Sequence, residues 1–184
     1  MVAHISRLAI ATAVVLMMSG EAAAQVPAPQ SVIAAYFDAA NAYDTAAAQA
    51  LVTPETVLRF AVGSPSNPDG TRFIGAEGVA TRFDAAVTGN VHDEVANFEV
   101  TGDRVTFTDF HSNNAFRMLG IASLEFRGEA VVRAGKIMTL TVSYTPAALA
   151  RQQAALSAPQ GAPAQVPALE RADPTMGDSA AALP

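Results

Sequence analysis

The sequence predicts an α+β fold in which helices come first and an antiparallel sheet follows. In the first half of the chain, apolar residues recur at the three- and four-residue spacing of an amphipathic helix. In the second half the spacing changes to alternation, the period of a strand with one buried face. Short Gly-containing turns separate the alternating segments, as in a hairpin meander. This order is typical of proteins whose helices pack on one face of the sheet.

Three helices and one short strand are expected in the first half. Ser31 is suited to cap the first helix, and Asp44 or Thr45 the second, which Thr53-Pro54 would end. The third helix carries Val79, Phe83 and Val87 on one stripe. The expected elements are helices over residues 31–43, 45–52 and 75–88, a strand over residues 57–62, and a loop over residues 63–70.

Four alternating segments form the expected meander. Residues 101–103 and Ala134-Gly135 have the composition of hairpin turns, and Pro146 ends the last strand. A closing helical turn is expected over residues 147–153. The strands are expected over residues 91–100, 104–113, 122–133 and 137–144.

The first 24 residues have the pattern of a secretory signal peptide. One arginine precedes an apolar run at residues 8–18, and Ala22-Ala23-Ala24 offers a small-residue cleavage site. The run is shorter than the roughly 20 residues that span a membrane. We therefore expect cleavage after Ala24 and a periplasmic or secreted protein that no longer touches a membrane.

The remaining chain divides into a short lead, one domain and a tail. Residues 25–30 are expected to be extended, and residues 31–153 to form the domain. Residues 154–184 hold prolines among Ala, Gly and Gln and no aromatic residue. Such a segment cannot bury enough apolar surface to offset its ordering entropy, so we expect a disordered Pro/Ala-rich tail.

Composition excludes several classes of function. The net charge is −6 and no Lys/Arg cluster is present, so nucleic acid is not an expected partner. The chain has no cysteine, which excludes disulfides, thiolate metal sites and a cysteine nucleophile. Hydrophobic residues make up 51% of the chain, enough for a packed core.

Four stretches together resemble the SnoaL-like branch of the nuclear transport factor 2-like superfamily. They are residues 32–44, the entry to the third helix at 73–79, the hairpin at 100–105 and the last hairpin at 128–144. The resemblance implies a cone-shaped fold, with three N-terminal helices packed in the concave face of a curved antiparallel sheet. It also implies a pocket inside the cone and a homodimer. It implies no single activity, since the superfamily holds isomerases, dehydratases, epoxide hydrolases, cyclases and binding proteins.

The residues of the steroid isomerase branch match at one position only. Tyr36 stands where that branch keeps a hydrogen-bonding tyrosine on its first helix. No acid stands at residues 59–61, where its carboxylate base would fall, and only Glu129 lies beside Gly128, where its second acid would fall. Ketosteroid isomerase chemistry is therefore not expected.

A polar cluster follows the apolar part of the 91–113 hairpin. If residues 102 and 103 form the tip, Val100 lies opposite Val105 and Phe98 opposite Phe107 on the inward face. The same register continues through three polar pairs: Ala96 with Asp109, Glu94 with His111, and His92 with Asn113.

Directly opposed side chains are close enough for Glu94 and His111 to share a hydrogen bond, which would orient the imidazole as a general base. The candidate catalytic residues are thus His111, Glu94 and Asp109. Two alternatives remain open. The two histidines and two carboxylates could hold a divalent metal. A bulge between Glu94 and Asp109 would turn the far half of the hairpin over and place the cluster in solvent.

Two functions follow from these features. The first is a binding protein that holds a small apolar molecule in the cone, with no cofactor and no metal. The second is a cofactor-independent lyase, isomerase or hydrolase that uses the histidine–carboxylate pair, with Tyr36 as a hydrogen-bond donor or simply a core aromatic. The expected ligand-binding residues are Tyr36, His92, Asn113, Phe98 and Phe107.

Overall fold

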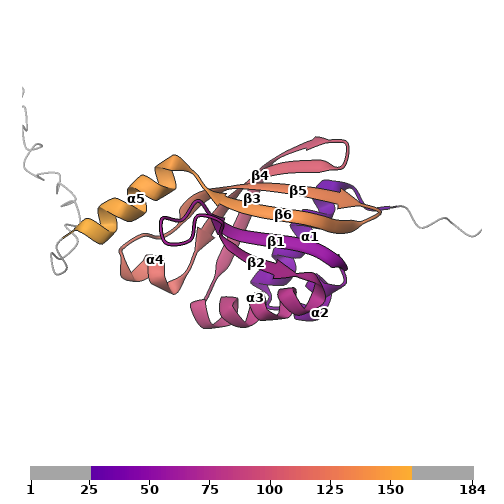
Figure 1. The fold of residues 1–184 in the computed structure, drawn as a ribbon, viewed down its shortest axis with the longest axis horizontal. Coiled ribbons are helices and arrows are strands. Elements are labelled where there is room, and N and C mark those ends of the chain that lie inside the picture. The colour runs from indigo at the N-terminus through magenta and orange to yellow at the C-terminus, as the bar shows by residue number, and fades with distance from the viewer. Residues whose placement is uncertain (1–25, 159–184) are drawn as a thin grey trace, which may run out of the picture.

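The computed structural model describes residues 26–158 and combines five helices with a six-stranded sheet (Figure 1). The predicted signal peptide and most of the predicted tail lie outside these residues. The helices are α1 (Pro29–Asn41), α2 (Thr45–Gln49), α3 (Gly75–Gly89), α4 (Asn114–Met118) and α5 (Pro146–Ser157). The strands are β1 (Val52–Val62), β2 (Thr71–Ile74), β3 (His92–Thr101), β4 (Arg104–Ser112), β5 (Leu124–Arg133) and β6 (Lys136–Tyr144).

The sheet has the strand order β2-β1-β6-β5-β4-β3 and is mixed. The meander β3 to β6 is antiparallel, as predicted, but β1 pairs with β6 in parallel. Alternation cannot distinguish the two cases, because the side-chain period is two in both. The expectation of three N-terminal helices is also wrong: only α1 and α2 precede the sheet, and α3 follows the short strand β2.

The core lies between α1, α3 and the concave face of the sheet. Ile33, Tyr36 and Phe37 of α1 are buried, and the Phe37 ring meets Phe107 of β4 at a centroid distance of 5.5 Å. Tyr36 also packs edge-on against Phe83 of α3, at 6.2 Å. Each such burial stabilises the fold by roughly 1.5–3 kcal/mol. These contacts hold α1 and α3 on the face of the sheet that carries the pocket.

Gly128 of β5 lets the Phe107 ring approach the β5 backbone closely. A Cβ built on Gly128 would stand 2.1 Å from Phe107 Cζ. The two residues face each other across the β4–β5 pair. Any larger residue at 128 would therefore displace the ring that α1 packs on.

Both ends of the described chain are more helical than predicted. α1 begins at Pro29 with Ala28 as N-cap, so residues 29 and 30 of the expected extended lead are helical. α5 runs to Ser157, past the expected turn at residues 147–153 and into the expected tail, and Thr145 Oγ1 caps it by accepting from the Ala148 N–H at 3.1 Å. No helix within residues 26–158 is long and apolar enough to cross a membrane.

A bulge in β3 changes the register of the β3–β4 hairpin. Val100 lies opposite Val105 as predicted, but Ala96 lies opposite Thr108, because Asn97 and Phe98 together face Phe107. Asn97 adopts a left-handed conformation with φ of 53°, which asparagine tolerates better than most residues. The Phe98 and Phe107 rings still contact each other, tilted by 32° at a centroid distance of 5.7 Å. The residues of β3 before Asn97, from His92 to Ala96, therefore face the opposite side of the sheet from the one predicted.

Candidate functional site

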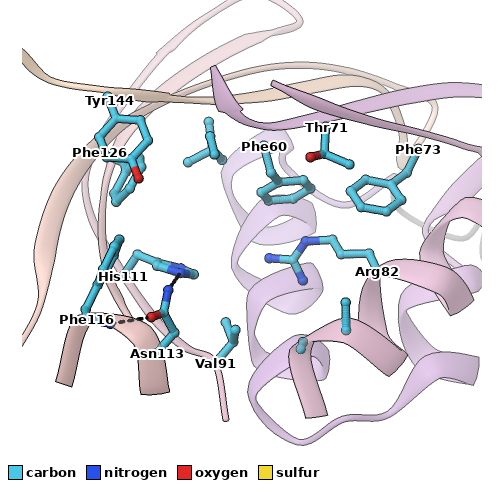
Figure 2. A pocket seen from close by; sticks show the side chains of 14 residues that line it. Phe60, Thr71, Phe73, Arg82, Val91, His111, Asn113, Phe116, Phe126 and Tyr144 are labelled. Atoms are coloured by element: carbon cyan, nitrogen blue, oxygen red, sulfur yellow. Dashed lines mark hydrogen bonds between the residues drawn. The ribbon is translucent and has the colours of Figure 1, made fainter. Parts of the chain in front are cut away.

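A pocket of about 270 Å³ opens between the sheet, α3 and α4. Its wall is mostly aromatic and aliphatic, with Phe60 and Phe73 on one side and Phe116 and Phe126 on the other (Figure 2). Arg82 enters from α3, while His111 and Asn113 lie at the opposite side. Pockets of this kind, apolar with a few polar groups, are typical of small-molecule sites.

Asp93, which does not line the pocket itself, forms hydrogen bonds to both Arg82 and His111. Its carboxylate accepts from Arg82 Nη2 at 3.2 Å and from His111 Nδ1 at 2.5 Å. Asp93 is 2% exposed and Arg82 6% exposed, so the ion pair is almost completely removed from water. Asp93 occupies the position opposite His111 that the sequence assigned to Glu94.

The position of Asp93 is fixed by the end of α1. Asn41 donates from Nδ2 to the Asp93 carbonyl at 2.7 Å and accepts from the Asp93 N–H at 2.9 Å. The Tyr43 hydroxyl donates to the Val91 carbonyl at 3.0 Å, two residues earlier. β3 is an edge strand, and these bonds replace the strand neighbour that it lacks there.

Arg82 is held by its ion pair and by an aromatic ring. Its guanidinium carbon lies 3.9 Å from the centre of the Phe60 ring, a close cation–π contact. Figure 2 shows the guanidinium extending beneath Phe60 toward the middle of the pocket. The Nη1 atom is buried and has no hydrogen-bond partner among residues 26–158.

The hydrogen bonds of Asn113 determine which nitrogen of His111 carries a proton. Asn113 Oδ1 accepts from the Phe116 N–H at 2.8 Å and so caps α4, which directs Nδ2 to His111 Nε2 at 3.0 Å. Because Nδ2 can only donate, Nε2 must accept, and the ring proton is on Nδ1, facing Asp93. The ring itself lies edge-on to Phe116 and Phe126, at 5.7 and 5.5 Å.

The pKa values of the two buried carboxyl groups are shifted in opposite directions. Burial raises the pKa of Asp93, but the hydrogen bond from His111 and the charge of Arg82 outweigh it and hold that pKa below the usual 3.8. Burial, and then the charge of Asp93, raise the pKa of Asp109 well above 3.8. The surroundings therefore favour the ionised form of Asp93 and the protonated form of Asp109.

Asp93, Asp109 and His111 could together offer three ligand atoms to a metal, since these atoms lie within 4.8 Å of one another. The surroundings oppose a cation. Both oxygens of Asp93 already accept hydrogen bonds, one of them from the positively charged Arg82. The expected set of two histidines and two carboxylates does not form, because His92 and Glu94 are exposed.

The structure brings together part of the predicted site. Asp109 faces inward and is buried, and His111 and Asn113 line the pocket. Glu94 lies opposite Phe110 instead of His111, and His92 lies opposite Ser112, because the bulge turns this half of β3 over. The alternative of a bulge was therefore correct for β3, but β4 keeps its predicted facing.

Tyr36, Phe98 and Phe107 do not line the pocket. Phe107 is in the core, and Phe98 packs against it from the edge strand. Tyr36 is fully buried, and burial raises its pKa. Its hydroxyl has no partner in the described part of the chain.

The sequence interpretation missed Arg82, Asp93 and Asn41. For Arg82 a signal was present: it sits in the apolar stripe of α3, between Val79 and Ala86, where a charged residue must be buried with a partner. Asp93 had no such signal, because its facing depends on the bulge. Asn41 acts through contacts 52 residues away, which local spacing cannot reveal.

Comparison with known proteins finds no matching family model and no match among curated proteins. Solved structures do match. IdmH, a candidate polyketide cyclase from Streptomyces antibioticus, is 19% identical with a TM-score of 0.54, over 70% of this chain and 99% of that one. TerC, crystallised with polyporic acid, is 17% identical with a TM-score of 0.53, over 70% of this chain and 98% of that one.

A third similar structure is an NTF2-like protein of unknown function from Cytophaga hutchinsonii. It is 15% identical with a TM-score of 0.50, over 67% of this chain and 94% of that one. Others have ketosteroid isomerase-like or cystatin-like folds. At these identities the similarity concerns the fold: an open six-stranded sheet with helices on one face, as in the nuclear transport factor 2-like proteins.

Proposed function

We propose that this protein is exported and binds a small, largely apolar molecule in the pocket between Arg82 and His111. The observation that carries the proposal is the pocket itself: a cavity of about 270 Å³ whose wall is mainly aromatic and aliphatic. A volume just below the roughly 300–1,000 Å³ of ligand sites favours a small ligand. TerC, a protein of similar fold, was crystallised with polyporic acid, which supports a small-molecule ligand here.

Binding can be tested with N-phenyl-1-naphthylamine, a neutral apolar dye that fluoresces in dry sites. The wild type should enhance its fluorescence saturably. Ala85→Phe, which fills the pocket from α3, should abolish the enhancement, whereas Asp84→Phe on the exposed side of the same helix should not. An enhancement that is absent in the wild type, or equal in Ala85→Phe, contradicts the proposal.

A second candidate function is acid–base catalysis at His111. This residue lies in the pocket wall, with Nδ1 on a buried carboxylate that Arg82 neutralises. When a substrate replaces Asn113 at Nε2, that nitrogen takes a proton from it, and Asp93 balances the positive charge that develops on the ring. Asp93 is thus the carboxylate that orients His111, the role expected of Glu94 from the sequence. The reaction class is proton transfer at a carbon or oxygen acid, as in an isomerase, a lyase or a cyclase.

Proton transfer can be tested without knowledge of the natural substrate. 2-Tetralone is a neutral bicyclic carbon acid, and NMR follows the exchange of its acidic protons in D₂O. The wild type should accelerate the exchange, and His111→Gln should not. Equal rates for the two proteins remove the catalytic function but leave the binding function standing.

Export and dimer formation belong to the same proposal. The export signal is the pattern of residues 1–24, so protein recovered outside the cytoplasm should begin at Gln25 on N-terminal sequencing. Intact Met1 on such protein contradicts export. The homodimer rests on the resemblance to SnoaL-like proteins, and sedimentation at micromolar concentration tests it. A monomer under those conditions contradicts it.

A further inference from the structure

We propose that the pocket selects a neutral ligand with a hydroxyl group, a phenol or an enol, because such a group can replace both ends of the hydrogen bond from Asn113 Nδ2 to His111 Nε2. This inference rests on the proposed binding function and specifies the chemistry of its ligand. It concerns the polar end of the pocket, where His111 and Asn113 are joined by a hydrogen bond (Figure 2).

The first step is the fixed orientation of the Asn113 amide. Its oxygen caps α4 by accepting from the Phe116 N–H, so its nitrogen faces His111 Nε2. A flip of the amide would place two donors, the NH₂ and the Phe116 N–H, against each other. The cap of a five-residue helix thus decides the proton position on a pocket histidine.

The second step is what a ligand must offer to this pair. A hydroxyl that breaks the 3.0 Å bond between Nδ2 and Nε2 donates to Nε2 and accepts from Nδ2, so neither polar group is left unpaired. An ether or a carboxylate accepts from Nδ2 but has no proton for Nε2, which would then be buried against a second acceptor. Leaving a site's hydrogen-bonding group unpaired is the physical basis of strong selection between ligands that differ in one hydroxyl.

The third step is charge. Arg82 and Asp93 neutralise each other at 3.2 Å, and His111 in this tautomer is neutral. Burial and the charge of Asp93 raise the pKa of Asp109 well above the usual 3.8, which favours its neutral form. The charges of Arg82, Asp93 and this tautomer of His111 therefore sum to zero, and an anionic ligand gains nothing from them that offsets its loss of water.

Three probes of one shape separate these chemistries: 2-naphthol, its methyl ether 2-methoxynaphthalene, and 2-naphthoate. Calorimetry with the full-length exported protein should give a Kd for 2-naphthol at least about tenfold lower than for the ether or the carboxylate. Equal binding of naphthol and ether overturns the inference and leaves the binding function intact. Strongest binding of the carboxylate also overturns it and indicates anion recognition by Arg82. Failure of all three probes contradicts the binding function and the inference together.

A matched pair of variants tests the role of Asn113. Asn113→Asp keeps the oxygen that caps α4 but replaces the donor at Nε2 with an acceptor, so it should remove the preference for naphthol. Asn114→Asp adds the same charge one residue later, on an exposed side chain, and should keep the preference. A preference that survives in Asn113→Asp overturns the inference.

The proton position has a readout that needs no ligand. Long-range ¹⁵N–¹H correlation spectra distinguish the two ring nitrogens of histidine. In the wild type His111 should carry its proton on Nδ1 and present Nε2 as an acceptor. A proton on Nε2 alone overturns the inference whatever the probes do.

Discussion

The side chain of Asn41 and the backbone of Asp93 exchange two hydrogen bonds, of 2.7 and 2.9 Å. They join the last residue of α1 to the edge strand β3 at the residue that orients His111. The catalytic candidates are therefore held in place from behind by a helix end rather than by the sheet alone.

We expect Asn41→Ala to destabilise the protein by about 1–3 kcal/mol, because it leaves a partly buried N–H and C=O of Asp93 without partners. Urea unfolding measures the change. Asp38→Ala, an exposed substitution on the same helix, is the control and should stay within about 0.5 kcal/mol of the wild type. Equal effects of the two substitutions would mean that water replaces the Asn41 bonds at no cost.

Asp93→Asn should cost about 3–5 kcal/mol, since Arg82 would keep its charge at 6% exposure with no ionised partner. The double variant Asp93→Asn/Arg82→Met removes both charges and should recover a large part of that loss. A thermodynamic cycle from urea unfolding gives the coupling free energy. If the double variant is as unstable as the sum of the single variants, the ion pair is not the reason for the loss.

Asp109→Asn should change the pH dependence of stability. The raised pKa of Asp109 means that the folded state binds its proton more tightly than the unfolded state. Stability of the wild type is then lost as pH rises above the usual carboxyl pKa toward the raised one. An amide cannot ionise, so the stability of the variant relative to the wild type should increase from pH 4.5 to pH 8. A difference that stays constant with pH would show that Asp109 ionises freely in the fold.

Gly128→Ala should destabilise the protein by about 1–3 kcal/mol, because the new methyl group would overlap the Phe107 ring. Gly89→Ala in α3 is the control: its Cβ would meet only Val91 Cγ2, at 3.4 Å, and helix propensity favours the change. Thermal unfolding compares the two. A neutral Gly128→Ala would mean that the core shifts to admit the methyl group.

The elements with a clear period could be predicted from the sequence. α3 and the four strands of the meander agree to within about two residues, because each buries one face against the core. The strand β2 spans Thr71–Ile74 and exposes three of its four residues, so it carries no alternation to read. The parallel partner of β1 depends on the whole chain between β1 and β6, and no local pattern encodes it.

The candidate site was predictable on one of its two strands. His111 and Asp109 of β4 face inward as the alternation from Val105 requires. On β3 the same reasoning failed at Asn97, because a single residue in a left-handed conformation interrupts the ladder. Nothing in the residues around Asn97 distinguishes a bulge from a continuous strand, since asparagine occurs in both.

The bulge in β3 decides which carboxylate lies beside His111. If Asn97 and Phe98 were both paired in a continuous ladder, the segment from His92 to Ala96 would slip by one position against β4, and Glu94 would take the place of Asp93 beside His111. The longer side chain would reach the imidazole from a different height, and Asp93 would turn outward, away from Arg82. The extra residue in β3 therefore decides which carboxylate meets His111 and Arg82, and a deletion of Asn97 would remove the bulge while keeping Asp93 opposite His111. Homologues of this chain should therefore be aligned on the bulge before their acidic residues are compared.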